Sequence, residues 1–262
     1  MINFDFKKSL GQNFLNDENI INKIVKFSNV DKDTLVIEIG PGAGALSKKM
    51  IPLAGYSVLY EIDTRLKDIL DDALGGYSNY EIIFNDVLKQ NLKQDISKFN
   101  YKKIYVVANL PYYITTPIIT KVIDELNPDK IVIMIQEEVA DRLSASVGGR
   151  DYGMITVALG AFYDIKKLFK VSRNCFTPAP NVDSAVISLD KHNKYEIINK
   201  DIFDKLISDA FKFKRKNLRN NLKGYDLNKI EEILSRYNYG LGDRAEVIPV
   251  SLFIIIANEL KK

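Results

Sequence analysis

Apolar runs alternate with amphipathic segments along the first two thirds of the chain. Five short apolar runs predict strands at residues 35–39, 57–61, 81–85, 104–108 and 130–136. The segments between them predict helices at residues 45–51, 64–74 and 117–126. Such alternation builds βαβ units, so we expect an α/β fold with a doubly wound, largely parallel sheet. Two further strand-like runs, 155–162 and 184–189, follow.

The pattern changes beyond residue 190. Only helical periodicity is visible there, at roughly residues 200–213, 227–237 and 251–262. We therefore predict a larger α/β domain at residues 1–190 and a small all-helical domain at residues 191–262. A chain of 262 residues is long enough to bury both cores.

Glycines and carboxylates follow the first three predicted strands. Ligands of open α/β sheets bind beyond the carboxyl ends of the strands. Gly40 and Gly42 follow the first strand, where glycine lets the backbone turn sharply and approach a ligand. Glu61 ends the second strand and Asp86 follows the third. These carboxylates either cap strand ends or accept hydrogen bonds from a ribose and an adenine amino group.

The fourth strand is followed by Asn109-Leu110-Pro111-Tyr112. Pro111 excludes helical geometry at its neighbour and leaves backbone carbonyls available, Asn109 adds a side-chain acceptor, and Tyr112 offers a stacking face. An ordinary turn with a core tyrosine is the alternative to a clamp for an amino-bearing ring. NAD would also need a pyrophosphate site and a second nucleotide-binding half, so the pattern favours S-adenosyl-L-methionine.

Composition narrows the chemistry. One cysteine and one histidine argue against a disulfide, a zinc cluster and a histidine triad, so we expect no metal and a cytoplasmic location. Cys175 lacks the context of a thiolate nucleophile. Residues 1–8 lack the apolar core of a signal peptide, and Pro249 and Ser251 interrupt the apolar stretch 247–257, so we expect no membrane association.

The net charge of +3 is concentrated in two segments without acids. Residues 211–223 carry Lys212, Lys214, Arg215, Lys216, Arg219 and Lys223. Residues 165–182 carry Lys166, Lys167, Lys170 and Arg173. The phenylalanines interleaved with them are Phe169, Phe176, Phe211 and Phe213. A solvated helix face is one interpretation. The near-helical spacing of Phe211, Leu218 and Leu222 would gather the cations on the opposite side, which favours nucleic-acid binding.

Motifs along the whole chain resemble those of the ribosomal RNA adenine dimethyltransferases, which dimethylate N6 of adenosines. They are residues 9–15 (SLGQNFL), 38–44 (EIGPGAG), 109–117 (NLPYYITTP), 176–184 (FTPAPNVDS), 215–224 (RKNLRNNLKG) and 244–246 (RAE). The set is most similar to the small-subunit branch of the family. One departure is Glu137, where relatives commonly have a lysine.

The resemblance implies a Rossmann-like class I S-adenosyl-L-methionine-dependent methyltransferase fold with a small all-helical C-terminal domain for RNA recognition. It implies that Asn13 and Leu15 close over the cofactor, although residues 12–15 also suit a helix-capping turn. It further implies that Gly40 contacts the methionine end of the cofactor, Glu61 the ribose and Asp86 the adenine. Asn109 would lie between cofactor and substrate.

The expected reaction is direct methyl transfer to N6 of two adjacent adenosines in a hairpin loop near the 3′ end of 16S rRNA, in the small ribosomal subunit or its precursor. Asn109 and the Leu110 carbonyl would hold the amino group, with Tyr112 and Phe176 stacking on the flipped base. We expect a monomer that also serves small-subunit biogenesis. Alternatives are a large-subunit (23S) rRNA methyltransferase, a mainly non-catalytic RNA-binding assembly factor, and a DNA adenine methyltransferase.

Overall fold

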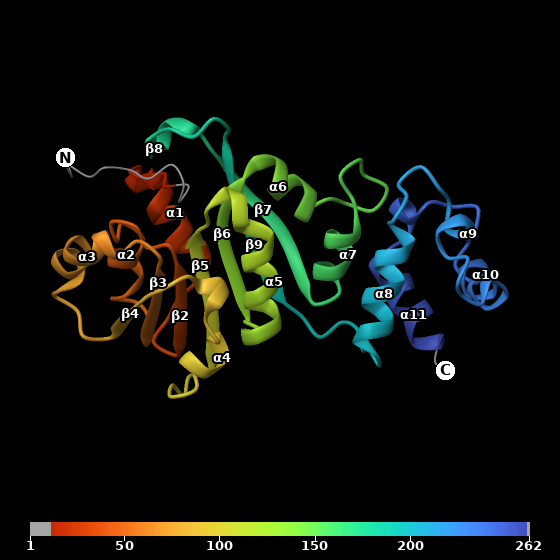
Figure 1. Cartoon of the computed structure of the whole chain (residues 1–262), viewed down its shortest axis with the longest axis horizontal. Helices are drawn as coiled ribbons and strands as arrows, with labels where there is room; N and C mark the ends of the chain where they lie inside the picture. Colours follow the sequence, from red (N-terminus) through yellow and green to blue (C-terminus); the bar gives the residue numbers. More distant parts are fainter. Residues whose placement is uncertain (1–11, 261–262) are drawn as a thin grey trace. The chain divides into compact units, whose positions relative to one another are not determined.

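The computed structural model describes residues 12–260 of the chain (Figure 1). Two compact units are present. The sheet unit comprises residues 1–140 and 166–190, and the helical unit comprises residues 141–165 and 191–262. Residues 141–165, which we expected in the first domain, therefore group with the C-terminal helices.

The sheet unit is built on one mixed seven-stranded sheet with the order β4-β3-β2-β5-β6-β9-β7. Its strands are β2 (Thr34–Ile39), β3 (Tyr56–Glu61), β4 (Tyr80–Phe84), β5 (Lys103–Asn109), β6 (Lys130–Gln136), β7 (Tyr163–Val171) and β9 (Ser184–Lys191). The first five run parallel, and β9 runs antiparallel to β6. The ends of these five strands lie within one residue of the sequence prediction. The chain order reverses at β2, whose neighbours are β3 and β5, and ligands of such sheets bind at this point.

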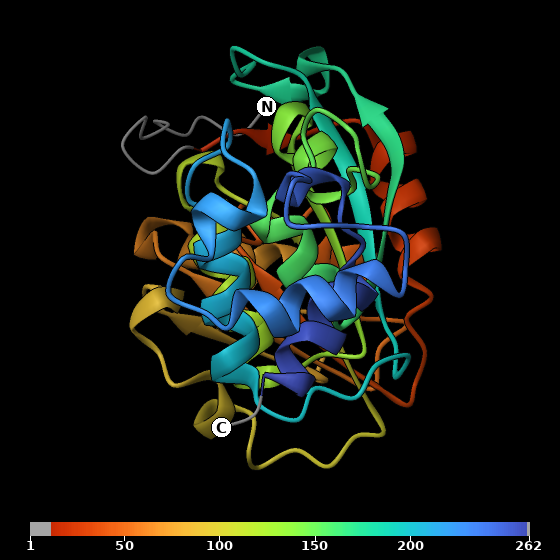
Figure 2. The same ribbon diagram turned by 90° about the vertical axis from the view of Figure 1, so that its right-hand side faces the viewer.

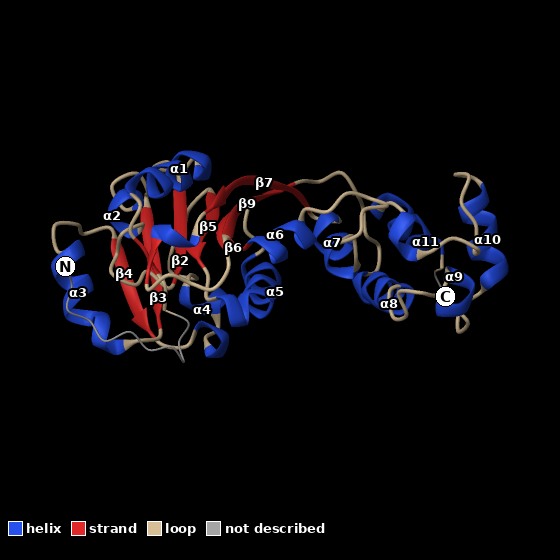
Figure 3. Ribbon diagram, turned by 90° about the horizontal axis from the view of Figure 1, so that it is seen from above, coloured by secondary structure: helices blue, strands red, loops and turns tan. Residues whose placement is uncertain are grey.

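Helices cover both faces of this sheet (Figure 3). They are α1 (Glu18–Ser28), α2 (Ser47–Met50), α3 (Lys67–Leu74), α4 (Leu92–Asp95) and α5 (Thr115–Leu126). The next helix, α6 (Glu137–Leu143), follows β6 directly and includes the boundary between the two units. In Figure 3, α1 and α2 lie on one face of the sheet and α4 and α5 on the other. Ile21 and Ile24 of α1 are buried with Val36 and Val107 of the sheet, so the amphipathic face of α1 closes this core. A small ladder pairs β1 (Phe14–Leu15) with β8 (Phe176–Thr177).

Two elements differ from the sequence prediction. Residues 155–162 do not form a strand, because α7 spans Met154–Gly160. An apolar run of this length has no decisive period, and Val157 is buried in the helical core with Phe203. The sequence prediction did not include β7, because its lysines interrupt the apolar pattern expected of a buried strand.

The helical unit adds α8 (Lys200–Ala210), α9 (Leu218–Asn221), α10 (Leu227–Ser235) and α11 (Val250–Glu259), drawn in blue in Figure 2. Phe203, Ile233 and Phe253 are buried in its core. The predicted helix 200–213 ends at Ala210, because Asn221 Nδ2 donates to the Ala210 carbonyl (2.6 Å) and the chain then turns. The last two residues of the predicted helix 251–262 lie outside the described part of the chain.

Candidate active site

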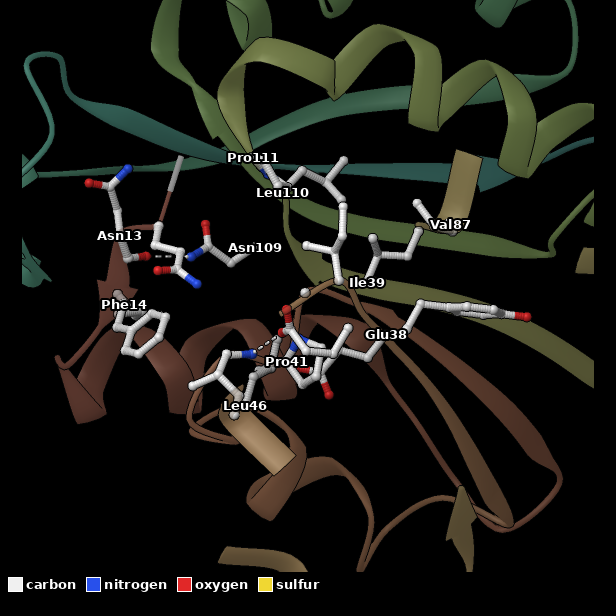
Figure 4. Close-up of a pocket in the computed structure, with 18 of the residues that line it drawn as sticks. Asn13, Phe14, Glu38, Ile39, Pro41, Leu46, Val87, Asn109, Leu110 and Pro111 are labelled. Carbon is white, nitrogen blue, oxygen red and sulfur yellow. Dashed lines mark hydrogen bonds between the residues drawn. The ribbon is translucent and has the colours of Figure 1, made fainter. Parts of the chain in front are cut away.

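A pocket lies at the carboxyl ends of the parallel strands of the sheet unit (Figure 4). Its empty volume is about 1170 Å³ including the open mouth. Eight of the nine site residues predicted from the sequence line it: Asn13, Leu15, Gly40, Glu61, Asp86, Asn109, Leu110 and Tyr112. They come from five separate chain segments, so the fold brings together what the sequence spreads over a hundred residues.

The loop after β2 contains glycines in a backbone conformation that other residues rarely adopt. Gly40 and Gly42 have φ of +71° and +58°, in the left-handed region that favours glycine. A Cβ on Gly42 would lie 3.2 Å from the ring of Phe14, and one on Gly40 would lie 3.8 Å from the backbone oxygen of Asn109. This loop forms a cradle that a ligand can approach closely.

Glu61 is fixed between this loop and the end of β3. Its Oε2 accepts from the Gly42 N–H (3.1 Å) and its Oε1 from the Asp63 N–H (2.9 Å). Burial raises the pKa of this carboxyl, while these backbone donors act in the opposite direction. Glu61 thus caps a strand end and lines the pocket at once. A carboxylate oxygen accepts more than one hydrogen bond, so acceptor capacity for ribose hydroxyls is retained.

Glu38 of β2 is a buried acid to which sequence patterns assigned no role of its own. It is 1% exposed, and its Oε2 accepts from Ser47 Oγ (2.6 Å). Burial raises the pKa of Glu38 to about 8. The sequence feature that could have identified Glu38 is that it is the one acid in the strand sequence TLVIEI.

Asp86 follows β4 and begins the short 3₁₀ helix Val87–Lys89. Its Oδ1 accepts from the Leu88 N–H (3.0 Å), and its own N–H donates to Asn85 Oδ1 (2.8 Å). This bond caps the 3₁₀ helix and not the end of β4, so it differs from the strand-end cap that was one expectation for Asp86. It does not exclude binding, because Asp86 also lines the pocket.

The N-terminal segment crosses the pocket at β1. Asn109 Nδ2 donates to the Asn13 carbonyl (3.2 Å), a bond drawn in Figure 4. Gln12 Nε2 donates to Asp63 Oδ2 (2.8 Å). Residues 12–15 do not form the helix cap, since the side chain of Asp17 caps α1.

The tetrapeptide after β5 is anchored on three sides. The Leu110 N–H donates to the Met134 carbonyl (3.1 Å), and Thr115 Oγ1 donates to the Pro111 carbonyl (3.1 Å). The Tyr112 hydroxyl lies 2.6 Å from Ser184 Oγ, and burial raises the pKa of Tyr112. These contacts hold the tetrapeptide in place beside the pocket, with Tyr112 half-buried.

Two aromatic residues differ from expectation. Phe176, expected beside the target base, is 4% exposed, belongs to a hydrophobic cluster with Leu15 and Val171, and does not itself line the pocket. Tyr113, which sequence analysis did not single out, lines the pocket and is 59% exposed.

The two basic segments also differ from one another. In the second, Glu137 pairs with Lys167 (3.1 Å) and Lys170 (2.8 Å), and Asp183 pairs with Lys170 (3.1 Å). In the first, all six cations are exposed. The acid-free sequence of residues 165–182 therefore overstated the positive charge of that surface.

Within residues 12–260, no group of histidine, cysteine and acidic side chains is arranged to hold a metal ion. No helix in the same range has the length and apolar character to cross a membrane.

The pocket itself has the donors and acceptors that a nucleoside cofactor needs: glycine-loop backbone, a buried carboxylate at the end of β3 and a carboxylate after β4.

Comparisons with known proteins agree with this chemistry. The sequence matches the Ribosomal RNA adenine dimethylase family over residues 3–262. Ribosomal RNA small subunit methyltransferase A of Clostridioides difficile is 42% identical, covering 98% of this chain and 91% of that protein. The enzyme of the same name from Geobacillus kaustophilus is 43% identical, covering 98% of this chain and 92% of that protein.

Solved structures give the same result. A dimethyladenosine transferase from Plasmodium falciparum superposes with a TM-score of 0.78 at 27% identity, covering 94% of this chain and 96% of that one. The 23S rRNA methyltransferase ErmE superposes with a TM-score of 0.76 over 95% of this chain and all of that one, and at 24% identity it shows the fold alone. The predicted methyltransferase fold, enzymatic activity and S-adenosyl-L-methionine cofactor are confirmed. The chain belongs to the ribosomal RNA adenine dimethylase family.

Proposed function

We propose that this protein dimethylates N6 of two adjacent adenosines in a hairpin loop near the 3′ end of 16S rRNA, within the small ribosomal subunit or its precursor. The names of the relatives above 40% identity support the small subunit over the large one. The observation that carries the proposal is the convergence of eight of the nine predicted residues on one pocket. We also propose that the protein acts in the cytoplasm, as a monomer and with a role in small-subunit biogenesis; an rRNA substrate supports the cytoplasmic location.

S-adenosyl-L-methionine supplies an electrophilic methyl group when bound. We assign its methionine end to the Gly40 loop, its ribose to Glu61 and its adenine to Asp86, with Asn13 and Leu15 covering it. The left-handed glycines support the first assignment, because they add no side chain of their own between the loop backbone and a ligand. The buried, backbone-held carboxylate of Glu61 supports the second.

We assign the target base to Asn109, Leu110 and Tyr112. The adenine amino nitrogen is a weak nucleophile because its lone pair is delocalised into the ring. Acceptance of its hydrogens by Asn109 Oδ1 and the Leu110 carbonyl favours a pyramidal, more nucleophilic nitrogen. Tyr112 supports the flipped base by stacking, and its bond to Ser184 holds the ring in place. Fixed positioning of this kind contributes about 7–11 kcal/mol to catalysis.

The proposal is tested by methyl transfer from labelled cofactor to unmethylated small subunits, large subunits and adenine-containing DNA, followed by nucleoside analysis. We expect label in N6,N6-dimethyladenosine from small-subunit RNA alone. Label confined to large-subunit RNA, or to DNA, would overturn the assigned substrate. Binding to small subunits without any label would favour the assembly-factor alternative.

A further inference from the structure

Four phenylalanines are interleaved with the two basic segments, and the structure separates them by exposure. Phe176 is buried, and Phe169 is half-buried with its ring centroid 5.8 Å from that of Phe27. Phe211 is half-buried, 5.7 Å from Phe253 by ring centroids. Phe213 is the one of the four that is exposed, at 56%. Of these four rings, the Phe213 ring is therefore the one that a ligand can contact without rearrangement of the hydrophobic core.

The backbone that carries Phe213 is held in place. The Phe213 carbonyl accepts from the Lys216 N–H (2.9 Å) and from Asn221 Nδ2 (3.3 Å). Asn221 Nδ2 also donates to the last carbonyl of α8, at Ala210 (2.6 Å). The turn between α8 and α9 is therefore tied to both helices, and little conformational entropy is lost when a ligand binds the exposed ring.

Charge decides what kind of ligand suits this ring. Lys212, Lys214, Arg215 and Lys216 flank it and are exposed, and residues 211–223 contain no acid. Lys212 Nζ lies 5.7 Å from the centroid of the Phe213 ring. An aromatic face among cations matches an unpaired nucleotide, whose base stacks while its phosphates meet the lysines. An apolar peptide surface would not require this density of charge.

We infer that Phe213 is a stacking platform for one unpaired base of the RNA, with Lys212, Lys214 and Lys216 binding the phosphates on either side. The inference rests on the proposed function, since it concerns how the RNA substrate is held. This platform belongs to the helical unit and is separate from Tyr112, which lines the methyl-transfer pocket. Bases inside a duplex are already stacked, so the platform selects RNA with an unpaired segment.

The test uses the full-length protein and two RNA probes: a hairpin with 2-aminopurine in its unpaired loop, and a blunt duplex of equal length. Phe213→Ala is expected to weaken binding of the hairpin about tenfold, with an unchanged salt dependence, and to leave duplex binding unaffected. Phe213→Trp is expected to retain hairpin affinity. Quenching of 2-aminopurine on binding is expected with the wild type and Phe213→Trp but not with Phe213→Ala.

Tyr237 offers a matched control. It is also an exposed aromatic residue of the helical unit (48%), but the neighbouring Arg236 is paired with Glu232 (2.7 Å) and Glu259 (3.1 Å). Tyr237→Ala is expected to bind both probes as the wild type does. Equal losses on hairpin and duplex, or no loss with Phe213→Ala, would overturn the platform. Wild-type methylation of small subunits, measured in parallel, separates that failure from a failure of the proposed function.

Discussion

Asn109 lies between the part of the pocket assigned to the cofactor and the part assigned to the target base. Its Nδ2 donates to the Asn13 carbonyl, so the remaining amide oxygen is the atom assigned to the target amino group. Asn109→Ala removes that acceptor and releases the N-terminal segment. We expect turnover to fall about 10²-fold, because misplacement of reacting groups by about 1 Å costs this much.

Single-turnover methylation of small subunits measures this effect, and fluorescence anisotropy measures RNA binding by the same variant. RNA affinity is expected to stay near that of the wild type, since the basic surface is unchanged. Asn228→Ala, an exposed change of the same chemistry in α10, is the control and is expected to be fully active. Normal turnover by Asn109→Ala would remove Asn109 from the mechanism.

Glu38 gives a pH dependence with a defined sign. Its pKa rises from an ordinary 4.5 to about 8 in the folded protein. Between these values the folded state holds a proton that the unfolded state releases, so stability is highest at low pH and falls as pH rises. The free energy of unfolding, relative to Glu38→Gln, is expected to fall by up to about 1.4 kcal/mol per pH unit in this window.

Urea unfolding at pH 5, 6.5 and 8 measures this dependence in the wild type and in Glu38→Gln. The glutamine keeps an oxygen that accepts from Ser47 and carries no charge to bury. Glu196→Gln, at an exposed site, is the control and is expected to keep the wild-type profile. Parallel profiles for the wild type and Glu38→Gln would contradict a buried, protonated Glu38.

Individual residues were predictable where a strand end supplied the position. Glu61 and Asp86 follow directly from that rule, because parallel strands place their carboxyl ends at one edge. The close approach of Phe14 to Gly42 was not predictable, since it depends on where an N-terminal segment crosses the pocket. The same holds for Glu137, the first residue of α6, whose ion pairs with Lys167 and Lys170 of β7 join segments that are distant in the sequence.

At the level of elements, the loop between β2 and α2 has a conformation that only glycine adopts without strain. Gly42→Ala adds a left-handed alanine, which costs about 1–2 kcal/mol, and places a methyl group 3.2 Å from the Phe14 ring. We expect this variant to fold with reduced stability and to bind S-adenosyl-L-methionine more weakly, because the loop is assigned to the cofactor. The expected loss of affinity is at least about tenfold, which corresponds to about 1.4 kcal/mol of binding free energy.

A substitution at Gly148 is a control that distinguishes the effect of backbone strain from an effect on ligand binding. The φ of Gly148 is +77°, and a Cβ there meets nothing within 4 Å. Gly148→Ala is therefore expected to lose similar stability while it binds the cofactor normally in calorimetry. If both variants bind the cofactor as the wild type does, the loop has no part in the cofactor site.

Element prediction succeeded for the five parallel strands and failed for β7 and α7. β2, β5 and β6 read as continuous apolar runs, which is the pattern of parallel strands covered by helices. β7 places exposed lysines beside half-buried residues, and this pattern resembles a basic surface segment. α7 is too short and too apolar for its period to distinguish a helix from a strand.

At the scale of the whole molecule, charge in the sequence and charge on the surface differ. Residues 165–182 lose much of their positive character to Glu137 and Asp183, whereas residues 211–223 keep six exposed cations. Arg219 of that stretch lies 3.8 Å from Glu231, and the charge of Lys212 also acts on Asp209. The surface of the helical unit is therefore the better candidate for the phosphate contacts that govern affinity.

Salt dependence of RNA binding tests this distinction between the two surfaces. Neutralising Lys214, Arg215 and Lys216 together is expected to weaken binding and to lower the slope of log affinity against log salt by about 0.7–0.9 for each phosphate that no longer meets a cation. Lys170→Gln also removes one cation, but one that Glu137 and Asp183 already neutralise, so its slope is expected to match the wild type. Anisotropy titrations of a small-subunit rRNA hairpin at four salt concentrations give both slopes. A lower slope for Lys170→Gln alone would assign the phosphate-binding surface to the sheet unit, because counterion release counts only the cations that meet phosphates.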